Sequence, residues 1–203
     1  MLSAGSGRCP YDRAMAVDPS GLSLRLYPDP VLRRRAEPVE LSDQVRAVAR
    51  RMLELMREEE GVGLAAPQVG LPWRLFVTHV PEGDGRSAFA APATADSQPC
   101  VYLNPVISGQ EGDLKSVEEG CLSLPDIRGP VLRPPRVTIT AMGLDGSTFT
   151  RSGAGLLARC WQHEQDHLDG VLIIDKMLAI YKLKNRGAIR DLEAEWAESG
   201  RSR

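Results

Sequence analysis

Two histidines in the string HEQDH, at residues 163–167, constrain this chain more than any other feature. On an α-helix, residues four positions apart lie on one face, so both imidazoles can bind one metal ion from a single rigid element. Glu164 follows the first histidine and would project near the open side of that metal, where a water molecule needs a base. The string therefore predicts a helix that carries a hydrolytic metal site.

The residues around this string have the apolar spacing of a buried helix. Leu156, Cys160, His163 and His167 follow one another at intervals of four, three and four residues and form one stripe. Gly170 comes shortly afterwards as a stop signal. Such short strings also arise by chance on amphipathic helices, so the metal site depends on a further ligand elsewhere in the chain.

A catalytic site of this kind needs a third protein ligand. No histidine follows His167, and the later glutamates lie in a charged terminal segment. The better candidate is Cys121, in the string EGCLSLP at residues 119–125, because a thiolate binds divalent metals strongly. Gly120 lets the backbone approach closely, and Pro125 is expected to end local strand pairing.

A third segment, GVGLAAPQVG at residues 61–70, is rich in small residues and has one polar side chain, Gln68. Its glycines match neither a dinucleotide-binding loop nor a phosphate-binding loop. A single amide among small apolar residues suits a wall that touches a substrate closely and donates one hydrogen bond to it.

The motifs GVGLAAPQ, EGCLS and QHEQDH, in this order and at comparable spacing, closely resemble those of the peptide deformylase family. That family removes the formyl group from the N-terminal formyl-methionine of new bacterial proteins. The resemblance extends from about Leu24 to Met177. It implies that the partners of this chain are N-formylmethionyl nascent peptides.

The resemblance also assigns roles to individual residues. It implies metal ligands at Cys121, His163 and His167. Glu164 would be the general base that takes a proton from a metal-activated water, and then the general acid for the departing amine. The side-chain amide of Gln68 and the backbone N–H of Leu122 would form an oxyanion site for the formyl oxygen. The competing interpretation, a nucleophilic Cys–His pair, is disfavoured because both histidines already bind the metal.

The pocket for the methionine side chain is expected to follow from the same resemblance. Its walls would include Val62, Val117, Leu156 and Cys160, which suit a thioether chain, and Gly63 is expected among the substrate-binding residues. Arg128 resembles a residue that contacts the substrate backbone. Arg128 and Arg159 are equally consistent with solvated surface arginines, which is the usual place for an arginine. Glu119 is expected to support the ligand shell by hydrogen bonding.

The ligand set does not select one metal. One thiolate and two imidazoles accept Fe²⁺, Zn²⁺, Ni²⁺ or Co²⁺. The family's working metal is often ferrous iron, so one divalent ion per chain is expected, Fe²⁺ in the cell and zinc, nickel or cobalt in samples. In some relatives the C-terminal region docks on the ribosome, but the mixed charges after residue 178 fit a solvated helix equally well.

Composition argues against several other classes of protein. A net charge of −2 over 203 residues gives no bulk attraction to nucleic acid. The four cysteines form no CxxC pair, and no apolar run is long enough to span a membrane. The N-terminus lacks the apolar core of a signal peptide, so the cytoplasm is the expected location.

The remaining pattern predicts one α+β domain, with antiparallel β-sheets packed around the central buried helix that carries the metal site. Strands are expected at residues 74–80, 100–106, 137–142, 148–151 and 170–174, and Ser42 is expected to cap a helix that Gly61 ends. Residues 1–22 would be a disordered tail, 23–177 the catalytic domain and 178–203 a C-terminal helix and tail. Residues 81–99 would form a mobile surface loop.

Two other classes of function remain open from the sequence. A metalloprotease with the same helix string would take a carboxylate or a histidine as its third ligand. A non-catalytic, metal-stabilised binding module would keep its metal and lose no activity when Glu164 is replaced.

Overall fold

The computed structural model describes residues 17–199, so most of the expected N-terminal tail, residues 1–16, lies outside it. Residues 17–22 contain a short 3-10 turn, η1 (Pro19–Gly21). Val17 and Leu22 on either side of this turn pack against a cluster of buried apolar residues around helix α1 (Asp43–Glu58). This end of the expected tail is therefore part of the folded domain.

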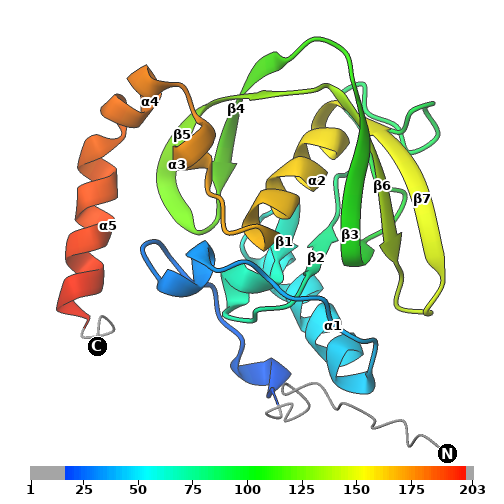
Figure 1. The fold of residues 1–203 in the computed structure, drawn as a ribbon, viewed down its shortest axis with the longest axis horizontal. Coiled ribbons are helices and arrows are strands. Elements are labelled where there is room, and N and C mark those ends of the chain that lie inside the picture. The colour runs from blue at the N-terminus through cyan, green and yellow to red at the C-terminus, as the bar shows by residue number, and fades with distance from the viewer. Residues whose placement is uncertain (1–16, 200–203) are drawn as a thin grey trace, which may run out of the picture.

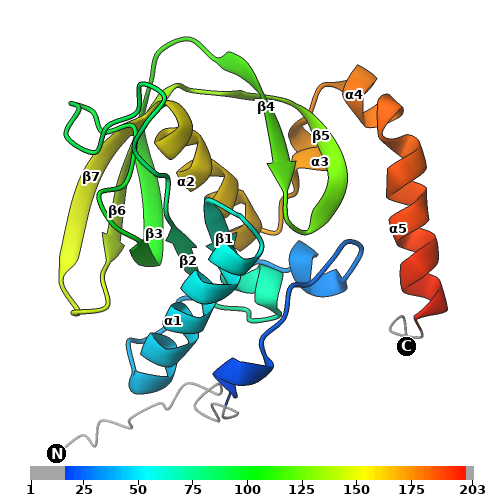
Figure 2. The same cartoon turned by 180° about the vertical axis from the view of Figure 1, so that it is seen from behind.

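Helix α1 forms where the sequence predicts it. The Ser42 hydroxyl caps it by accepting a hydrogen bond from the Val45 amide at 3.3 Å. Its buried face consists of Val45, Val48, Ala49, Met52, Leu55 and Met56, at the spacing of one helical stripe. This face packs on the five-stranded sheet that forms the centre of the fold, as Figure 2 shows from behind.

The five-stranded sheet is antiparallel, with the order β1-β2-β3-β6-β7. Its strands are β1 (Gly63–Ala65), β2 (Leu75–Thr78), β3 (Cys100–Glu111), β6 (Arg136–Met142) and β7 (Thr148–Ala154). Strand β1 lies at one end of the sheet and leads directly into a 3-10 turn, η3 (Ala66–Val69), which carries Gln68. The glycine-rich segment is therefore a sheet edge followed by a turn.

A second sheet consists of one hairpin, β4 (Lys115–Cys121) and β5 (Leu124–Arg133), which the sequence pattern does not predict. The expectation that Pro125 ends strand pairing is wrong, because β5 continues for eight residues beyond it to Arg133. The register is irregular between Gly120 and Cys121, and no partner faces Pro125. A proline is tolerated there because it has no N–H to donate to the ladder.

Helix α2 (Gly155–Leu168) lies between the two sheets, as Figure 1 shows. Leu157, Ala158, Trp161 and Leu168 are buried in a cluster with the β2, β3 and β6 side chains, which confirms the prediction of a buried central helix. The helix ends two residues before Gly170, which has a φ of 74°. A Cβ atom there would lie 2.5 Å from the Arg33 carbonyl oxygen, so both the turn and the close approach require glycine.

The chain after α2 differs from the expected strand and single helix. Residues 173–176 form a short helix, α3 (Ile173–Lys176), because the Asp175 carboxylate accepts a hydrogen bond from the Leu172 amide at 2.9 Å and caps it. Two helices follow, α4 (Ala179–Lys184) and α5 (Arg186–Glu198). They meet at Asn185, whose amide donates to the Arg128 carbonyl at 2.8 Å. Figure 1 shows α5 on the hairpin side of the molecule, opposite β7.

The irregular segment of residues 81–99 is fixed near its end. The buried Asp96 carboxylate accepts hydrogen bonds from the Thr78 hydroxyl at 2.8 Å and from the Val80 amide at 3.1 Å. The segment is therefore tied to the sheet rather than free along its whole length. In the described part of the chain, no helix combines the length and the apolar character needed to cross a membrane.

Candidate functional site

Three donor side chains from two elements meet beside α2. Cys121 comes from the end of β4, and His163 and His167 come from successive turns of α2. Their donor atoms all lie within 4.8 Å of one another, and Cys121 Sγ is 3.2 Å from His167 Nε2. Within residues 17–199, this is the one set of Cys, His, Asp or Glu side chains close enough to hold a metal ion.

The chemistry of these donors fits a divalent metal. His163 Nδ1 hydrogen-bonds Glu119 Oε2 at 3.0 Å, which leaves Nε2 of that ring for a metal. Burial is the main cause that lowers the pKa of His167 well below its ordinary value, and the charge of the neighbouring His163 is the second. This imidazole is therefore neutral and can donate a lone pair. One sulfur and two ring nitrogens occupy three positions of a four-coordinate ion.

The Glu164 carboxylate is a buried titratable group close to these donors. Its carboxylate is buried, and Oε2 has no hydrogen-bond partner among the described residues. Burial raises the pKa of Glu164 to about 7, although the nearby His163 and Arg133 act in the opposite direction. A bound cation would also lower this pKa. A carboxylate that ionises near neutral pH suits general acid–base catalysis.

The backbone of β1 packs directly on this carboxylate at Gly63. A Cβ atom at position 63 would lie 2.3 Å from Glu164 Oε1 and 2.8 Å from Cys160 Sγ. Only glycine leaves room for the Glu164 carboxylate in this position.

The Gln68 amide faces the donors in a fixed orientation. Its Oε1 accepts a hydrogen bond from the Ala65 amide at 2.8 Å, so Nε2 is the end turned inward. That Nε2 lies 3.2 Å from Ser123 Oγ and 3.6 Å from Cys121 Sγ. An N–H donor is therefore directed toward the region where Cys121 and the two histidines meet.

A cavity of about 570 Å³ opens beside the donors. Of the residues expected at the site, it is lined by Val62, Gly63, Gln68, Cys121, Leu122, Arg128, Leu156, Cys160, His163 and Glu164. Val117 is not in this wall: it lies two residues before Glu119 on β4, further from Cys121, and is 46% exposed. Arg128 is exposed at the cavity and makes no ion pair among the described residues.

Arg159 is buried rather than solvated. Its Nη1 donates to Glu119 Oε1 at 2.8 Å, and burial of this pair is nearly complete. One signal in the sequence indicated this: Arg159 is four residues before His163, on the face of α2 that was expected to be buried. An arginine on a buried face needs a carboxylate partner.

Glu119 hydrogen-bonds the ring of His163, as the sequence led us to expect, but its ion-pair partner Arg133 was not found from the sequence. Burial opposes ionisation of Glu119, but hydrogen bonds from Arg133 and His163 outweigh it and hold the pKa of this carboxyl well below its usual range. Arg133 also donates to Asp166 at 2.8 Å. Asp166 therefore faces an arginine rather than the Cys121, His163 and His167 side chains.

Comparisons with known proteins point to one family. A family model described as polypeptide deformylase matches residues 22–182. Peptide deformylase of Acidobacterium capsulatum is 43% identical over 173 residues, which cover 84% of this chain and 95% of that protein. Peptide deformylase 2 of Gloeobacter violaceus is 39% identical over 178 residues, or 85% of this chain and 90% of that protein. The crystal structure of peptide deformylase from Ehrlichia chaffeensis has a TM-score of 0.78 at 30% identity and covers 88% of this chain and 98% of its own.

Proposed function

The chain belongs to the polypeptide deformylase family, and from that premise we propose how its residues remove the formyl group from the N-terminal formyl-methionine of newly synthesised proteins. The observation that carries the proposal is the meeting of Cys121, His163 and His167 beside a cavity that also contains Glu164. The products are formate and a free amine. The cytoplasm is the proposed location.

Cys121, His163 and His167 are the proposed metal ligands. A divalent ion bound there would supply a Lewis acid that makes water more acidic and polarises the formyl carbonyl. Ferrous iron is the ion proposed in the cell, and the same ligands accept zinc, nickel or cobalt. The donor set gives Cys121 no role as a nucleophile, because both neighbouring imidazoles are ligands rather than bases.

Glu164 is proposed to move the proton. It takes a proton from the attacking water and delivers it to the amine nitrogen as the formyl C–N bond breaks. Its burial and its position against Gly63 hold the carboxylate beside the ligands. Because water is the nucleophile, no covalent intermediate with the protein forms.

Gln68 and Leu122 are proposed to stabilise the formyl oxygen as negative charge develops on it. The inward orientation of Gln68 Nε2 supports this role, and Leu122 lies in the cavity wall beside Cys121. Donors that are fixed before the reaction stabilise the transition state without reorganising.

The substitution Gln68→Leu is expected to lower kcat by about 10²–10³-fold, because it removes one such donor. Steady-state formate release and metal content would be measured on the same sample. Ser123→Ala is the matched control, since it removes the hydroxyl that lies 3.2 Å from Gln68 Nε2 but leaves the amide in place. A Gln68→Leu enzyme with normal metal content and wild-type kcat would contradict the oxyanion role.

The peptide is proposed to bind as an extended strand between two sheet edges. Strand β1 ends the five-stranded sheet, and β4 pairs only with β5 among the described strands. Gly63 of β1 and residues 118–121 of β4 both line the cavity. An extended peptide there would hydrogen-bond to the backbone on either side and direct its methionine toward Val62, Leu156 and Cys160.

The decisive experiment is the release of formate from a short formyl-Met peptide by anaerobically prepared, iron-loaded protein, with the matching acetyl-Met peptide as control. Formate release with the first peptide and no acetate from the second is the expected result. An endopeptidase would instead cleave internal bonds of both peptides. No formate above background from metal-replete protein would overturn the proposed function.

A further inference from the structure

The hairpin of β4 and β5 and the helix α2 supply different members of the donor set, yet they belong to different apolar clusters. The hairpin side chains Leu124, Ile127 and Val131 pack with α3 and with residues before α1. The buried apolar residues of α2 pack with the five-stranded sheet instead. Neither cluster contains residues of both elements, so apolar packing does not set the distance between Cys121 and the two histidines.

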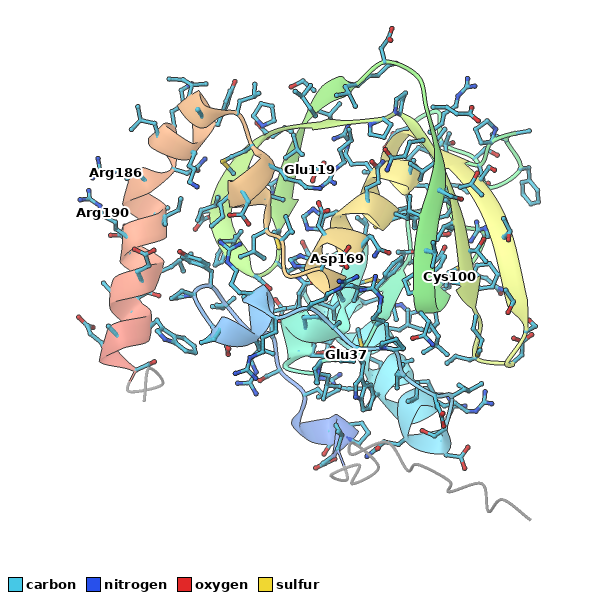
Figure 3. All side chains as sticks on the ribbon, in the orientation of Figure 1. Glu37, Cys100, Glu119, Asp169, Arg186 and Arg190 are labelled. Carbon is cyan, nitrogen blue, oxygen red and sulfur yellow. The ribbon has the colours of Figure 1, made fainter. Side chains whose placement is uncertain are left out.

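A network of buried charges joins the two elements. Its centre is Glu119 on β4, which Figure 3 shows between the hairpin and α2. Glu119 accepts hydrogen bonds from Arg133 of β5 at 2.6 and 2.8 Å and from Arg159 of α2 at 2.8 Å. The exposed fractions of these side chains are 4% for Glu119, 3% for Arg133 and 10% for Arg159. Such pairs are strong because little solvent screens them.

Besides its ion pair with Glu119, Arg159 of α2 makes two hydrogen bonds to the backbone of the hairpin. Its Nη1 also donates to the Val131 carbonyl of β5 at 3.2 Å, and its Nη2 donates to the Lys115 carbonyl of β4 at 3.4 Å. One guanidinium extending from α2 thus contacts both strands and the carboxylate between them. Its planar fork of donors permits this, whereas a lysine ammonium is a compact point charge.

A second ion pair also links the two elements, in this case from an arginine of the hairpin to a carboxylate of α2. Arg133 extends from β5 to the Asp166 carboxylate on α2 at 2.8 Å, and Lys176 of α3 binds the same carboxylate at 2.6 Å. If Arg159 is removed, Arg133 still neutralises Glu119 and the hairpin keeps its apolar cluster. The loss of Arg159 therefore loosens the hairpin without leaving a buried charge alone.

We propose that Arg159 is a positioning residue that fixes the β4–β5 hairpin against α2, so that Cys121 is held beside His163 and His167 before a metal binds. This inference rests on the proposed assignment of these three side chains as metal ligands. A preassembled donor set binds the ion without first ordering the hairpin, which raises affinity and slows release. Arg159 touches no reacting atom in this role.

The test compares Arg159→Met, Arg159→Lys and the matched control Arg151→Met. Arg151 is a partly buried arginine on β7 that binds Asp96 and Tyr102, away from the hairpin. Two readouts are used on each variant. Hydrogen exchange of the metal-free protein measures the protection of the β4–β5 amides relative to the α2 amides. The rate of Co²⁺ transfer to a chelator, followed by the thiolate–cobalt absorption band, measures how tightly the complete ligand set holds the metal.

The expected result for Arg159→Met is faster exchange of the hairpin amides, unchanged exchange in α2 and Co²⁺ release that is about 10–100-fold faster than wild type. For Arg159→Lys, both the hairpin exchange rate and the Co²⁺ release rate should lie between those of wild type and Arg159→Met, because lysine keeps the charge but cannot contact both strands. Arg151→Met should leave hairpin exchange and Co²⁺ release unchanged; because Arg151 lies over the ring of Trp161, any faster exchange should be confined to α2 and the five-stranded sheet. The proposal would be overturned if both Arg159 variants showed the hairpin exchange and the Co²⁺ release of wild type. It would also be overturned if Arg151→Met changed these two rates as much as Arg159→Met does. Neither readout uses a peptide, so a wild-type protein that releases no formate would reject the proposed function and leave this test intact.

Discussion

Glu164→Gln is expected to reduce formate release by about 10²–10⁴-fold while the protein keeps its metal, because the amide cannot accept the proton of the attacking water. Glutamine has nearly the volume of glutamate, so the contact with the Gly63 backbone is preserved. The measurements are kcat with a formyl-Met peptide and the metal content of the same sample. This outcome separates the enzyme from a metal-stabilised binding module, for which the substitution removes no activity.

The matched control for this prediction is Glu118→Gln. Glu118 is an exposed carboxylate that lines the same cavity and makes no hydrogen bond or ion pair among the described residues. The Glu118→Gln variant should keep kcat close to the wild-type value. If Glu164→Gln retained metal and turned over as fast as Glu118→Gln, the base would have to be another group.

Cys121→Ala is expected to abolish tight metal binding. Loss of a hydrogen-bond partner behind a metal ligand already costs about 10–100-fold in affinity, and loss of the ligand itself should cost more. Metal stoichiometry after dialysis against a weak chelator measures the effect. Cys160→Ala is the control, because Cys160 is a buried cysteine in the wall of the same cavity but outside the donor group.

Cys121→Ala and Cys160→Ala also distinguish the deformylase from a metalloprotease that carries the same helix string. A metalloprotease with a carboxylate or histidine ligand would keep its metal in Cys121→Ala. Of the later glutamates, Glu193 accepts a hydrogen bond from the Tyr27 hydroxyl at 2.8 Å on α5, away from the donors. Equal metal content in the two cysteine variants would therefore contradict the ligand set proposed for this site.

The parts of the fold that sequence predicted have strong local signals. Helix α1 has both a serine cap and a complete apolar stripe, and α2 has the stripe that places two histidines on one face. The donor set followed from these signals together with the EGCLS motif. In each case the information lies within a few residues of the element itself.

The hairpin was missed because its sequence lacks the alternation of a half-buried strand. Most β4 side chains are exposed, and the one that is fully buried, Glu119, is charged. Its arginine partners are 14 and 40 residues away, so only the folded chain brings them to it. At α3 the signal was ambiguous, since the apolar pair Ile173–Ile174 suits a strand or a helix and the Asp175 cap decides between them.

The two sheet edges on either side of the cavity have a consequence for the range of proteins this enzyme can process. Every polypeptide has the same pattern of amide N–H and carbonyl groups, whatever its side chains, and an open strand edge reads only that pattern. Selection would then be confined to the first residue, whose proposed pocket is lined by Val62, Leu156 and Cys160. An enzyme that binds its substrates in this way gains breadth by recognising the backbone that all of them share.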